Sequence, residues 1–582
     1  MIKKMPLDLD STLSPGLLRR SSGPARRLPA AAVALSLCAY LALLGCAGTD
    51  GEAPPTTPSL EELEAAITAE ELRTDIAALS SDEMGGRGPG SEGDRMARQY
   101  MIEQMQAIGL EPGGPNGSWE QPFEIVGVTS EVPETWTFTG AGGSLALKDF
   151  EQFIAGSGVQ AEKATVEDAE LVYVGYGIVA PEYQWDDFDG VDLSGKMLVV
   201  LNNDPDWSDD LFEGTRRLYY GRWSYKYETS AAQGAAGAII IHTTPSAGYP
   251  FQVVQTSWTG EQFQLPAGDE PRNQIEAWVT EDAAKQLFEL AGLDYDAQME
   301  AARSADFTPV PMGVRTSLTL DNTVTRKETA NVLGVLPGTD PQLSDEYVVY
   351  TAHHDHLGNA GEGEDPIYNG ALDNASGVAQ VLAIARQLKR APTRRSNLFN
   401  FVAAEEQGLL GSEFYARNPT VAPGKMAANL NFDGGNIWGK TRDVTYIGLG
   451  KSSLDEVVRA GAARQGREVL PDQFPDKGFF YRSDQFNFAK IGVPAIYLDT
   501  GTDFIDREPG WGKQQIDQWT EVHYHQVSDE LLDDWNFDGM IDDVALGLYC
   551  GITIGNADEM PRWNEGDEFE RARLDALATV AE

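Results

Sequence analysis

The sequence contains little cysteine and little positive charge. Cys38, Cys46 and Cys550 are the only cysteines among 582 residues, too few for a disulfide framework or a thiolate zinc site. Any metal site must therefore be built from imidazole and carboxylate groups. Lysine and arginine total 44 against 90 aspartates and glutamates, which gives a formal net charge of -46. Because a surface that negative repels phosphate backbones, we expect no nucleic acid partner.

Two common hydrolase motifs are also missing. The chain has no HExxH motif of single-zinc endopeptidases, and no GxSxG motif of serine hydrolases accompanies a suitable histidine. The composition is otherwise ordinary, with 42% hydrophobic and 23% charged residues. These values are typical of soluble globular proteins and exclude a polytopic membrane protein, while the length allows roughly three or four domains.

The one long apolar run lies near the amino terminus and is typical of an export signal. Arginines precede an apolar stretch from about Leu28 to Leu44, and Cys46 follows it in a pattern that resembles a bacterial lipobox. We predict a lipoprotein signal peptide over residues 1–45, a lipid anchor on Cys46 and a flexible linker over residues 46–59. The protein would then be an exported bacterial lipoprotein, membrane-anchored and periplasmic or at the cell surface. A single anchoring helix is the alternative.

In the rest of the chain, the pattern of apolar and turn-forming residues changes twice. Apolar residues at helical spacing predict two helices between residues 60 and 110. Short β-rich runs between Gly, Pro and Asp clusters predict an inserted domain over residues 131–317. Thereafter strands alternate with amphipathic helices, which implies an α/β domain: a mostly parallel mixed sheet with helices on both faces. We assign residues 60–130 and 318–582 to this α/β domain. Its candidate strands are NVLGVL, EYVVYTA, NLFNFVAA, MAANLNF, DVTYIGL and PAIYLD.

Three features invite a functional interpretation that we reject. The glycines from Gly88 to Gly93 match a dinucleotide-binding fingerprint, but no strand precedes them, so we expect a turn. His242 stands alone after an apolar strand and is expected to pack rather than bind a ligand. Acidic residues from Asp534 onward have calcium-loop spacing, but Ala545 occupies the twelfth position, where a glutamate belongs. We expect the start of a helix there.

Metal-binding residue types follow several predicted strands, and five of the six histidines lie in two short segments, AHHDHLG and EVHYHQVSDE. In open α/β sheets, ligands bind beyond the carboxyl ends of the strands. Imidazole and carboxylate groups arriving at one such rim suit zinc. Two imidazoles with three carboxylates suit two Zn²⁺ ions about 3.5–4 Å apart, which would activate a bridging water as hydroxide. The candidate residues are His353, Asp355, Asp373, Glu405, Glu406, Asp433 and His525.

Several motifs in this order and spacing resemble a known family. They are TAHHDHLG, NGALDNASG, AAEEQGLLGSEFYA, NLNFDG, FFYRSDQFNFAKIGVPAIYL and YHQVSDE. Together they resemble the dizinc exopeptidase family, which contains secreted bacterial aminopeptidases and glutamate carboxypeptidases. The likeness covers about Leu60–Leu110 and Ala330–Tyr549, and the segment between them resembles a protease-associated domain. Leu372 departs from the family pattern, which has an acid there, but the adjacent Asp373 is the position of the bridging ligand.

The resemblance implies a role for each of eight residues. His353 and Asp433 would bind one zinc ion, and Glu406 and His525 would bind the other. Asp373 would be the carboxylate that both ions share. Asp355 would fix the His353 tautomer as a neighbouring carboxylate. Glu405 would be the general base, and Tyr524 would stabilise the oxyanion.

Each position also has a purely structural interpretation. Glu405 and Glu406 could begin a helix, and Asp373 could be an N-cap. His354 and His356 are expected to pack or to line the cleft rather than to bind metal.

The resemblance implies a zinc-dependent exopeptidase acting on peptide substrates, with aminopeptidase activity favoured. The negative surface suits a cationic peptide terminus. The alternatives are a carboxypeptidase, a mono-zinc enzyme similar to glutaminyl cyclases, and a non-catalytic ectodomain on the same fold. The complete ligand set and Glu405 argue against the last two. Arg482 could contact a substrate carboxylate or form a salt bridge with Asp484, and we favour the salt bridge.

Overall fold

The computed structural model describes residues 57–208, 211–361 and 363–581. The signal peptide, the lipid anchor on Cys46 and nearly all of the predicted linker lie outside these residues and stay predictions. Among the described residues, no helix is both long and apolar enough to cross a membrane.

Three helices occupy the amino-terminal segment, where the sequence predicts two: α1 (Leu60–Glu64), α2 (Ala69–Leu79) and α3 (Glu92–Ile108). The first predicted helix is divided because Thr68 is extended and its side chain accepts a hydrogen bond from the Glu71 amide, which starts a new helix. The glycine-rich stretch forms a turn and the first turn of α3, which Ser91 caps, and from residue 57 onward no strand precedes it.

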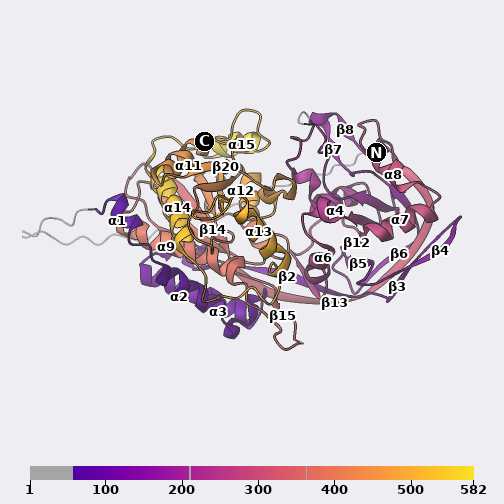
Figure 1. Ribbon diagram of the computed structural model, residues 1–582, viewed down its shortest axis with the longest axis horizontal. Helices are drawn as coiled ribbons and strands as arrows, with labels where there is room; N and C mark the ends of the chain where they lie inside the picture. Colours follow the sequence, from indigo (N-terminus) through magenta and orange to yellow (C-terminus); the bar gives the residue numbers. More distant parts are fainter. Residues whose placement is uncertain (1–56, 209–210, 362, 582) are drawn as a thin grey trace, which may run out of the picture. The chain divides into compact units, whose positions relative to one another are not determined.

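The α/β part is built on a mixed sheet whose central strands are parallel (Figure 1). Two pairings nearer its ends are antiparallel. They join β13 to β17 at one end and β19 to β21 toward the other. In spatial order the strands are β13 (Val310–Leu336), β17 (Ser396–Val402), β14 (Tyr347–His353), β18 (Met426–Asn431), β21 (Ala495–Asp499), β19 (Asp443–Ile447) and β20 (Glu468–Pro471). All six predicted strands are present.

Helices cover both faces of this sheet, as predicted. Side chains alternate along a strand, so Val348 and Tyr350 of β14 join one core cluster while Val349 joins another. The first cluster contains residues of α2, α9 (Ser376–Arg390) and α14 (Asp538–Asn556), and the second contains Tyr415 of α10 (Leu410–Arg417). The remaining helices of this part are α11 (Leu454–Arg464), α12 (Gln485–Lys490), α13 (Trp511–Val522) and α15 (Glu570–Ala581).

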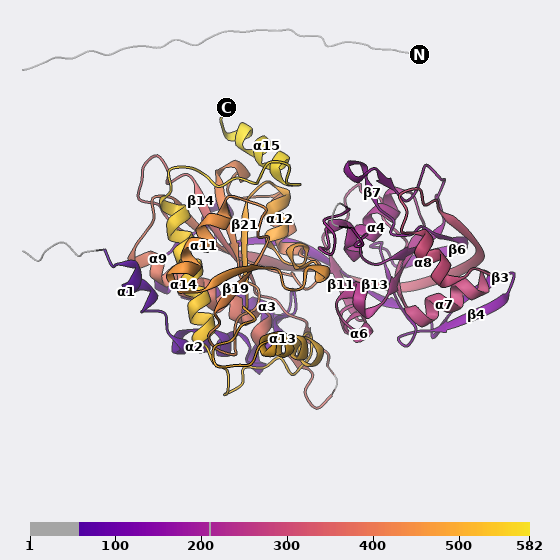
Figure 2. The same cartoon turned by 45° about the horizontal axis from the view of Figure 1, so that its top comes forward.

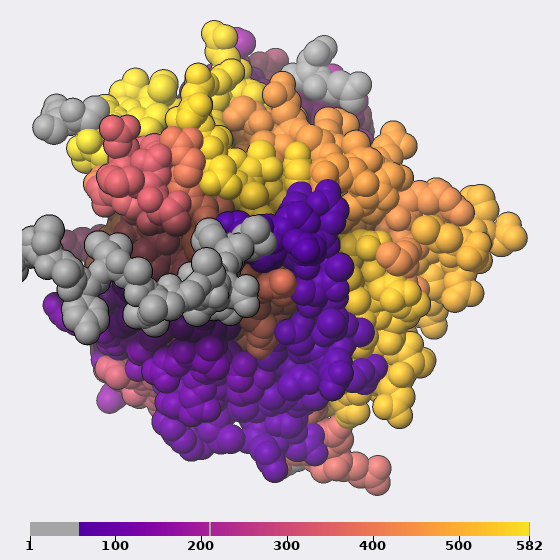
Figure 3. Space-filling model, turned by 90° about the vertical axis from the view of Figure 1, so that its left-hand side faces the viewer, coloured from indigo at the N-terminus to yellow at the C-terminus, as the bar shows by residue number. Residues whose placement is uncertain are grey.

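The amino-terminal helices and the carboxyl-terminal part of the chain share one face of the molecule, shown in indigo and yellow in Figure 3. The long helix α14 starts at Asp538, at the acidic segment with calcium-loop spacing, which is therefore a helix start as expected. Buried apolar residues of α2, α9 and α14 lie in the same cluster. Segments far apart in the sequence thus close one core beneath the sheet.

A β-rich segment with its own apolar core lies beside the α/β part in Figure 2. Its core includes Trp136, Phe138 and Phe288. Its strands are β2 (Glu120–Glu131), β3 (Thr135–Gly140), β4 (Gly143–Lys148), β5 (Phe153–Ser157), β6 (Lys163–Tyr173), β9 (Met197–Leu201), β10 (Gly237–His242), β11 (Glu261–Gln264) and β12 (Ile275–Thr280). Its helices are α4 (Trp223–Ala232), α5 (Thr244–Ala247), α6 (Phe251–Ser257), α7 (Glu281–Leu290) and α8 (Tyr295–Ala301).

The strand β13 connects the two parts. Its first half pairs with β6, its second half with β2, and its last residues with β17 of the α/β sheet. The predicted domain boundary at residue 317 therefore falls inside a continuous strand. His242 ends β10, where it is buried among Tyr249, Phe251 and Trp278, so it packs as predicted.

Short pairings complete the structure. They are β1 (Glu111–Pro112) on β13, β7 (Val179–Ala180) with β8 (Trp185–Asp186), and β15 (Gly358–Asn359) with β16 (Ile367–Tyr368).

Candidate metal centre

The five predicted metal ligands lie together at one rim of the α/β sheet. His353 is the last residue of β14, Glu406 lies in the loop after β17, and Asp433 follows β18. Asp373 lies in the turn before α9, and His525 lies shortly after α13. Parallel strands bring their carboxyl ends to the same edge, which is why residues so distant in sequence meet there.

The Asp373 carboxylate lies between two imidazoles. Its Oδ1 is 3.3 Å from His353 Nε2, and its Oδ2 is 3.4 Å from His525 Nε2. His353 Nε2 is also 3.3 Å from Asp433 Oδ1, and His525 Nε2 is 2.9 Å from Glu406 Oε2. Each histidine therefore has its own carboxylate and shares a third, which is the arrangement that two ions with a bridging carboxylate require.

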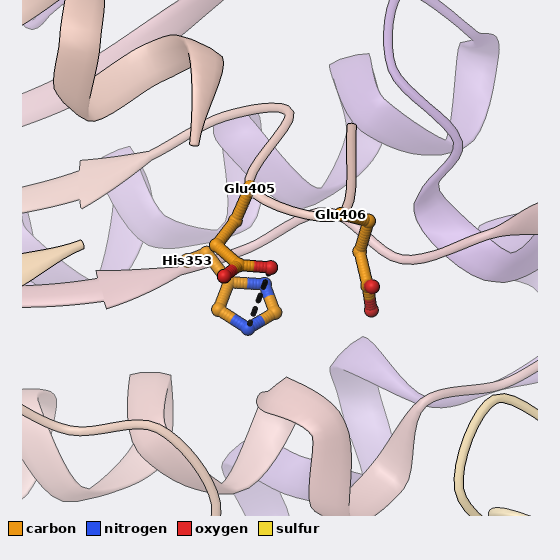
Figure 4. A group of neighbouring side chains, drawn as sticks. All are labelled: His353, Glu405 and Glu406. Atoms are coloured by element: carbon orange, nitrogen blue, oxygen red, sulfur yellow. Dashed lines mark ion pairs between the residues drawn. The ribbon is translucent and has the colours of Figure 1, made fainter. Parts of the chain in front are cut away.

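Figure 4 shows the Glu405 carboxylate close to the His353 ring, while Glu406 projects from the same loop. Glu405 Oε2 lies 3.9 Å from His353 Nε2. Three carboxylates of this rim, from Asp373, Glu405 and Asp433, have side chains that are at most 19% exposed. So many carboxylates in a dry environment repel one another unless a cation is bound.

The residues present fit zinc. His525 Nε2 is buried and, despite its proximity to Glu406, has no hydrogen-bond partner of suitable geometry among the described residues. A buried nitrogen without a hydrogen bond that faces carboxylate oxygens is expected where a metal ion completes the contacts. Imidazole and carboxylate are both ligands that zinc accepts.

The titration behaviour of the site follows from the same crowding. Burial lowers the pKa of His353, but the carboxylates of Glu405 and Asp433 outweigh burial and raise this pKa well above its ordinary value. Burial raises the pKa of Glu405 well above its ordinary value, and Asp433 and Glu406 add to that effect. A bound cation would reverse both shifts, because it favours neutral imidazole and ionised carboxylate.

Asp355 makes a different contact from the one predicted. Its Oδ1 is 3.8 Å from His353 Nδ1, and the Asp355 backbone carbonyl is the group within hydrogen-bond distance of that nitrogen, at 3.3 Å. The Asp355 carboxylate instead accepts hydrogen bonds from the amides of Glu405 at 3.0 Å and Glu406 at 3.3 Å. Asp355 thus fixes the loop that carries both glutamates.

The predicted salt bridge between Arg482 and Asp484 is wrong. Asp484 immediately precedes α12 and is fully buried, and neither carboxylate oxygen has a hydrogen-bond partner among the described residues. Arg482 points elsewhere and donates a hydrogen bond of 3.3 Å to the Tyr524 hydroxyl. The Tyr524 ring stacks on His525, with 3.9 Å between ring centroids. Arg482 and Tyr524 therefore both belong to the rim.

Two cavities open on either side of these residues. The larger, of about 430 Å³, is lined by Glu406 and His525 from the rim and by residues of the β-rich segment. The smaller, of about 160 Å³, is lined by Asp373 and Asp433 together with aromatic side chains. Both are lined by Tyr249, Glu405, Arg482 and Tyr524. A bound molecule could extend from one cavity to the other across the predicted metal site.

Sequence reasoning missed several supporting residues. Arg87 is fully buried and donates hydrogen bonds to the carbonyls of His354, Leu79, Asn369 and Gly370, at 2.6 to 2.9 Å. It holds the end of β14 against the segment that precedes Asp373. No local sequence pattern predicts this role, because Arg87 lies in a glycine-rich turn, where an arginine is normally exposed.

Asp529 supports the bridging position directly. It accepts hydrogen bonds from the amides of Leu372 at 2.9 Å and Asp373 at 3.0 Å. His354 packs against Asp94, with 3.0 Å between Nε2 and Oδ1. His356 is expected to pack or to line the cleft, and its Nδ1 is 2.6 Å from Oε1 of the predicted ligand Glu406.

The fold and the site together indicate a class of protein. A mixed α/β sheet whose parallel strands end in imidazole and carboxylate groups is an arrangement that suits a metal ion beyond the carboxyl ends of the strands. Residues 331–548 match the family described as Peptidase family M28. The resemblance to the zinc exopeptidase family is thereby confirmed for this segment.

Individual relatives agree with this assignment. Over 222 residues the chain is 29% identical to "Leupeptin-inactivating enzyme 1" of Streptomyces exfoliatus, covering 36% of this chain and 47% of that protein. Over 210 residues it is 31% identical to "Probable lipoprotein aminopeptidase LpqL" of Mycobacterium tuberculosis, covering 33% of this chain and 39% of that protein. The matched region is thus less than half the length of these curated relatives.

One solved structure shares the fold across most of the chain. "Aminopeptidase from Aneurinibacillus sp. strain AM-1" has a TM-score of 0.51 and 18% identity, covering 87% of this chain and 97% of that chain.

We predict that Arg87→Met destabilises the protein by about 2–4 kcal/mol, because it leaves several buried carbonyls without donors. Arg87→Lys should lose less, since an ammonium group keeps up to three donors. Denaturant unfolding of both variants measures the difference. Equal stability of Arg87→Met and the unsubstituted protein would contradict the role assigned to this guanidinium.

Proposed function

We propose that this protein is a zinc-dependent aminopeptidase that hydrolyses terminal peptide bonds. The position of Asp373 carries the proposal, because each of its carboxylate oxygens faces a different histidine. A mono-zinc enzyme would not need a carboxylate in that position. The match of residues 331–548 to Peptidase family M28 supports the reaction class.

In this proposal His353 and Asp433 would hold one zinc ion, Glu406 and His525 would hold the other, and Asp373 would offer a carboxylate oxygen to each. When bound, the two ions would supply Lewis acidity toward the scissile carbonyl and lower the pKa of a water molecule between them. His356 lies beside Glu406 and supports it from the buried side. Its contact helps to orient the Glu406 carboxylate toward His525.

Glu405 is proposed to move the proton. Its carboxylate lies next to His353 and lines both cavities, so it can reach a water molecule and a substrate at the rim. It would accept a proton from the attacking water and donate it to the leaving amine. The hydrogen bonds that the amides of Glu405 and Glu406 donate to the Asp355 carboxylate hold this glutamate in place.

Tyr524 is proposed to stabilise the oxyanion formed at the scissile carbonyl. Its hydroxyl accepts a hydrogen bond from Arg482, which leaves the hydroxyl hydrogen free to point toward substrate. The neighbouring positive charge also makes the hydroxyl a stronger donor. Tyr524 lines both cavities, where a scissile bond would lie.

Aminopeptidase activity is favoured over carboxypeptidase activity by two observations. The rim is rich in carboxylates, which attract the ammonium group of a free peptide amino terminus. Two of the similar proteins have names that include the word aminopeptidase.

The name of one of them also includes the word lipoprotein, which supports the proposal of an exported, lipid-anchored protein. We further propose that residues 131–317 form a protease-associated insert.

Glu405→Gln should lower kcat by about 100-fold or more while zinc content is unchanged, because the amide cannot accept the proton. Peptide hydrolysis and metal analysis of the same sample measure both effects. Glu413→Gln is the matched control: Glu413 lies in the next helix and pairs with Arg417 rather than with the rim. Full turnover by Glu405→Gln would show that another group is the base.

Peptides with a free amino terminus should be cleaved, and the same peptides with an acetylated amino terminus should not. The physical reason is that acetylation removes the charge that the carboxylates of the rim would bind. Amidation of the carboxyl terminus should have little effect. Cleavage that depends on a free carboxyl terminus instead would identify a carboxypeptidase.

A further inference from the structure

One side chain of the β-rich segment lies within hydrogen-bond distance of a predicted metal ligand. Ser257 is the last residue of α6, and its Oγ lies 3.0 Å from His525 Nδ1. The two residues are 268 positions apart in the chain. Among the described residues, Ser257 is the only hydrogen-bond partner of this nitrogen.

The chemistry of imidazole determines which group is the donor in the hydrogen bond between His525 and Ser257. A histidine that binds a metal through Nε2 uses the lone pair of that nitrogen, so the ring proton lies on Nδ1. His525 Nε2 faces Asp373 and Glu406, which leaves Nδ1–H to donate to the Ser257 oxygen. The partner of the second nitrogen fixes both the tautomer and the orientation of the ring.

The two histidines are oriented from different parts of the molecule. The Nδ1 atom of His353 faces the Asp355 carbonyl, two residues further along the same chain segment. His525 has no comparable local partner among the described residues. Its backbone has a φ of 58°, in the left-handed region that a non-glycine residue rarely adopts, so contacts from outside the loop must hold it.

A second contact from the β-rich segment reaches the same loop. Tyr524 stacks on His525 and accepts a hydrogen bond from Arg482. The Arg482 guanidinium in turn lies over the ring of Tyr249, 5.5 Å from its centroid. Tyr249 lies two residues before α6 and Ser257 is its last residue, so this short segment supports both the imidazole and the tyrosine beside it.

We propose that Ser257 is a positioning residue for His525, so that the second zinc site is complete only with the β-rich segment in place. The inference rests on the proposed function, since it requires that His525 binds an ion. It gives the segment a role at the metal centre itself, in addition to any contact with substrate.

Measurement of the zinc affinity of the protein and its variants tests the proposal. Competition with a chromophoric chelator should show that Ser257→Ala binds one of its two zinc ions about 10-fold or more weakly, with the other unchanged. Ser257→Thr keeps the hydroxyl and should restore the affinity. Thr256→Ala is the matched control, because the Thr256 hydroxyl bonds only to carbonyls of its own helix. Thermal unfolding of the metal-free variants checks that each one folds.

The possible failures are distinguishable. Unsubstituted protein that binds two zinc ions, together with a folded Ser257→Ala variant of equal affinity for both, would overturn this inference alone. Equal weakening by Ser257→Ala and Ser257→Thr would also overturn it, since the hydroxyl would then be irrelevant. Unsubstituted protein that binds no zinc would overturn the proposed function and this inference with it.

Discussion

Repulsion among carboxylates at one rim of the sheet is the constraint on which the site depends. Asp373, Glu405, Glu406 and Asp433 converge there with only limited exposure to water. Burying like charges together is unfavourable by several kcal/mol unless cations or protons neutralise them. The fold keeps these groups together because Glu405 and Glu406 follow β17, Asp433 follows β18 and Asp373 precedes α9, all at the same edge of the sheet. The proposed ions would convert this repulsion into binding energy.

The supporting interactions leave the carboxylates available. Arg87 is a buried cation close to this region, and its hydrogen bonds go to backbone carbonyls rather than to a side chain of the rim. Asp355 and Asp529 accept hydrogen bonds from backbone amides and so orient the loops beneath Glu405 and Asp373. Backbone groups thus fix the geometry, while the rim carboxylates face one another and the histidines. Such preorganisation is what a catalytic metal site needs.

Local sequence patterns predict six strands of the sheet, and the resemblance to the exopeptidase family predicts the ligand roles of the five residues that meet at its rim. Strands such as β14 and β18 are apolar runs, and the residues that follow them have donor atoms suited to zinc. The supporting residues could not be predicted, because Arg87, Asp529 and Ser257 act through contacts that span much of the chain. The prediction of a salt bridge between Arg482 and Asp484 was wrong for a related reason. Proximity in sequence did not place the two side chains in the same environment.

The most direct test of the bridging carboxylate is a crystal structure of zinc-soaked protein with anomalous data at the zinc edge. We predict two peaks about 3.5–4 Å apart, one beside His353 and Asp433 and one beside Glu406 and His525, with Asp373 between them. A single peak, or two peaks that Asp373 does not contact, would contradict the dizinc centre.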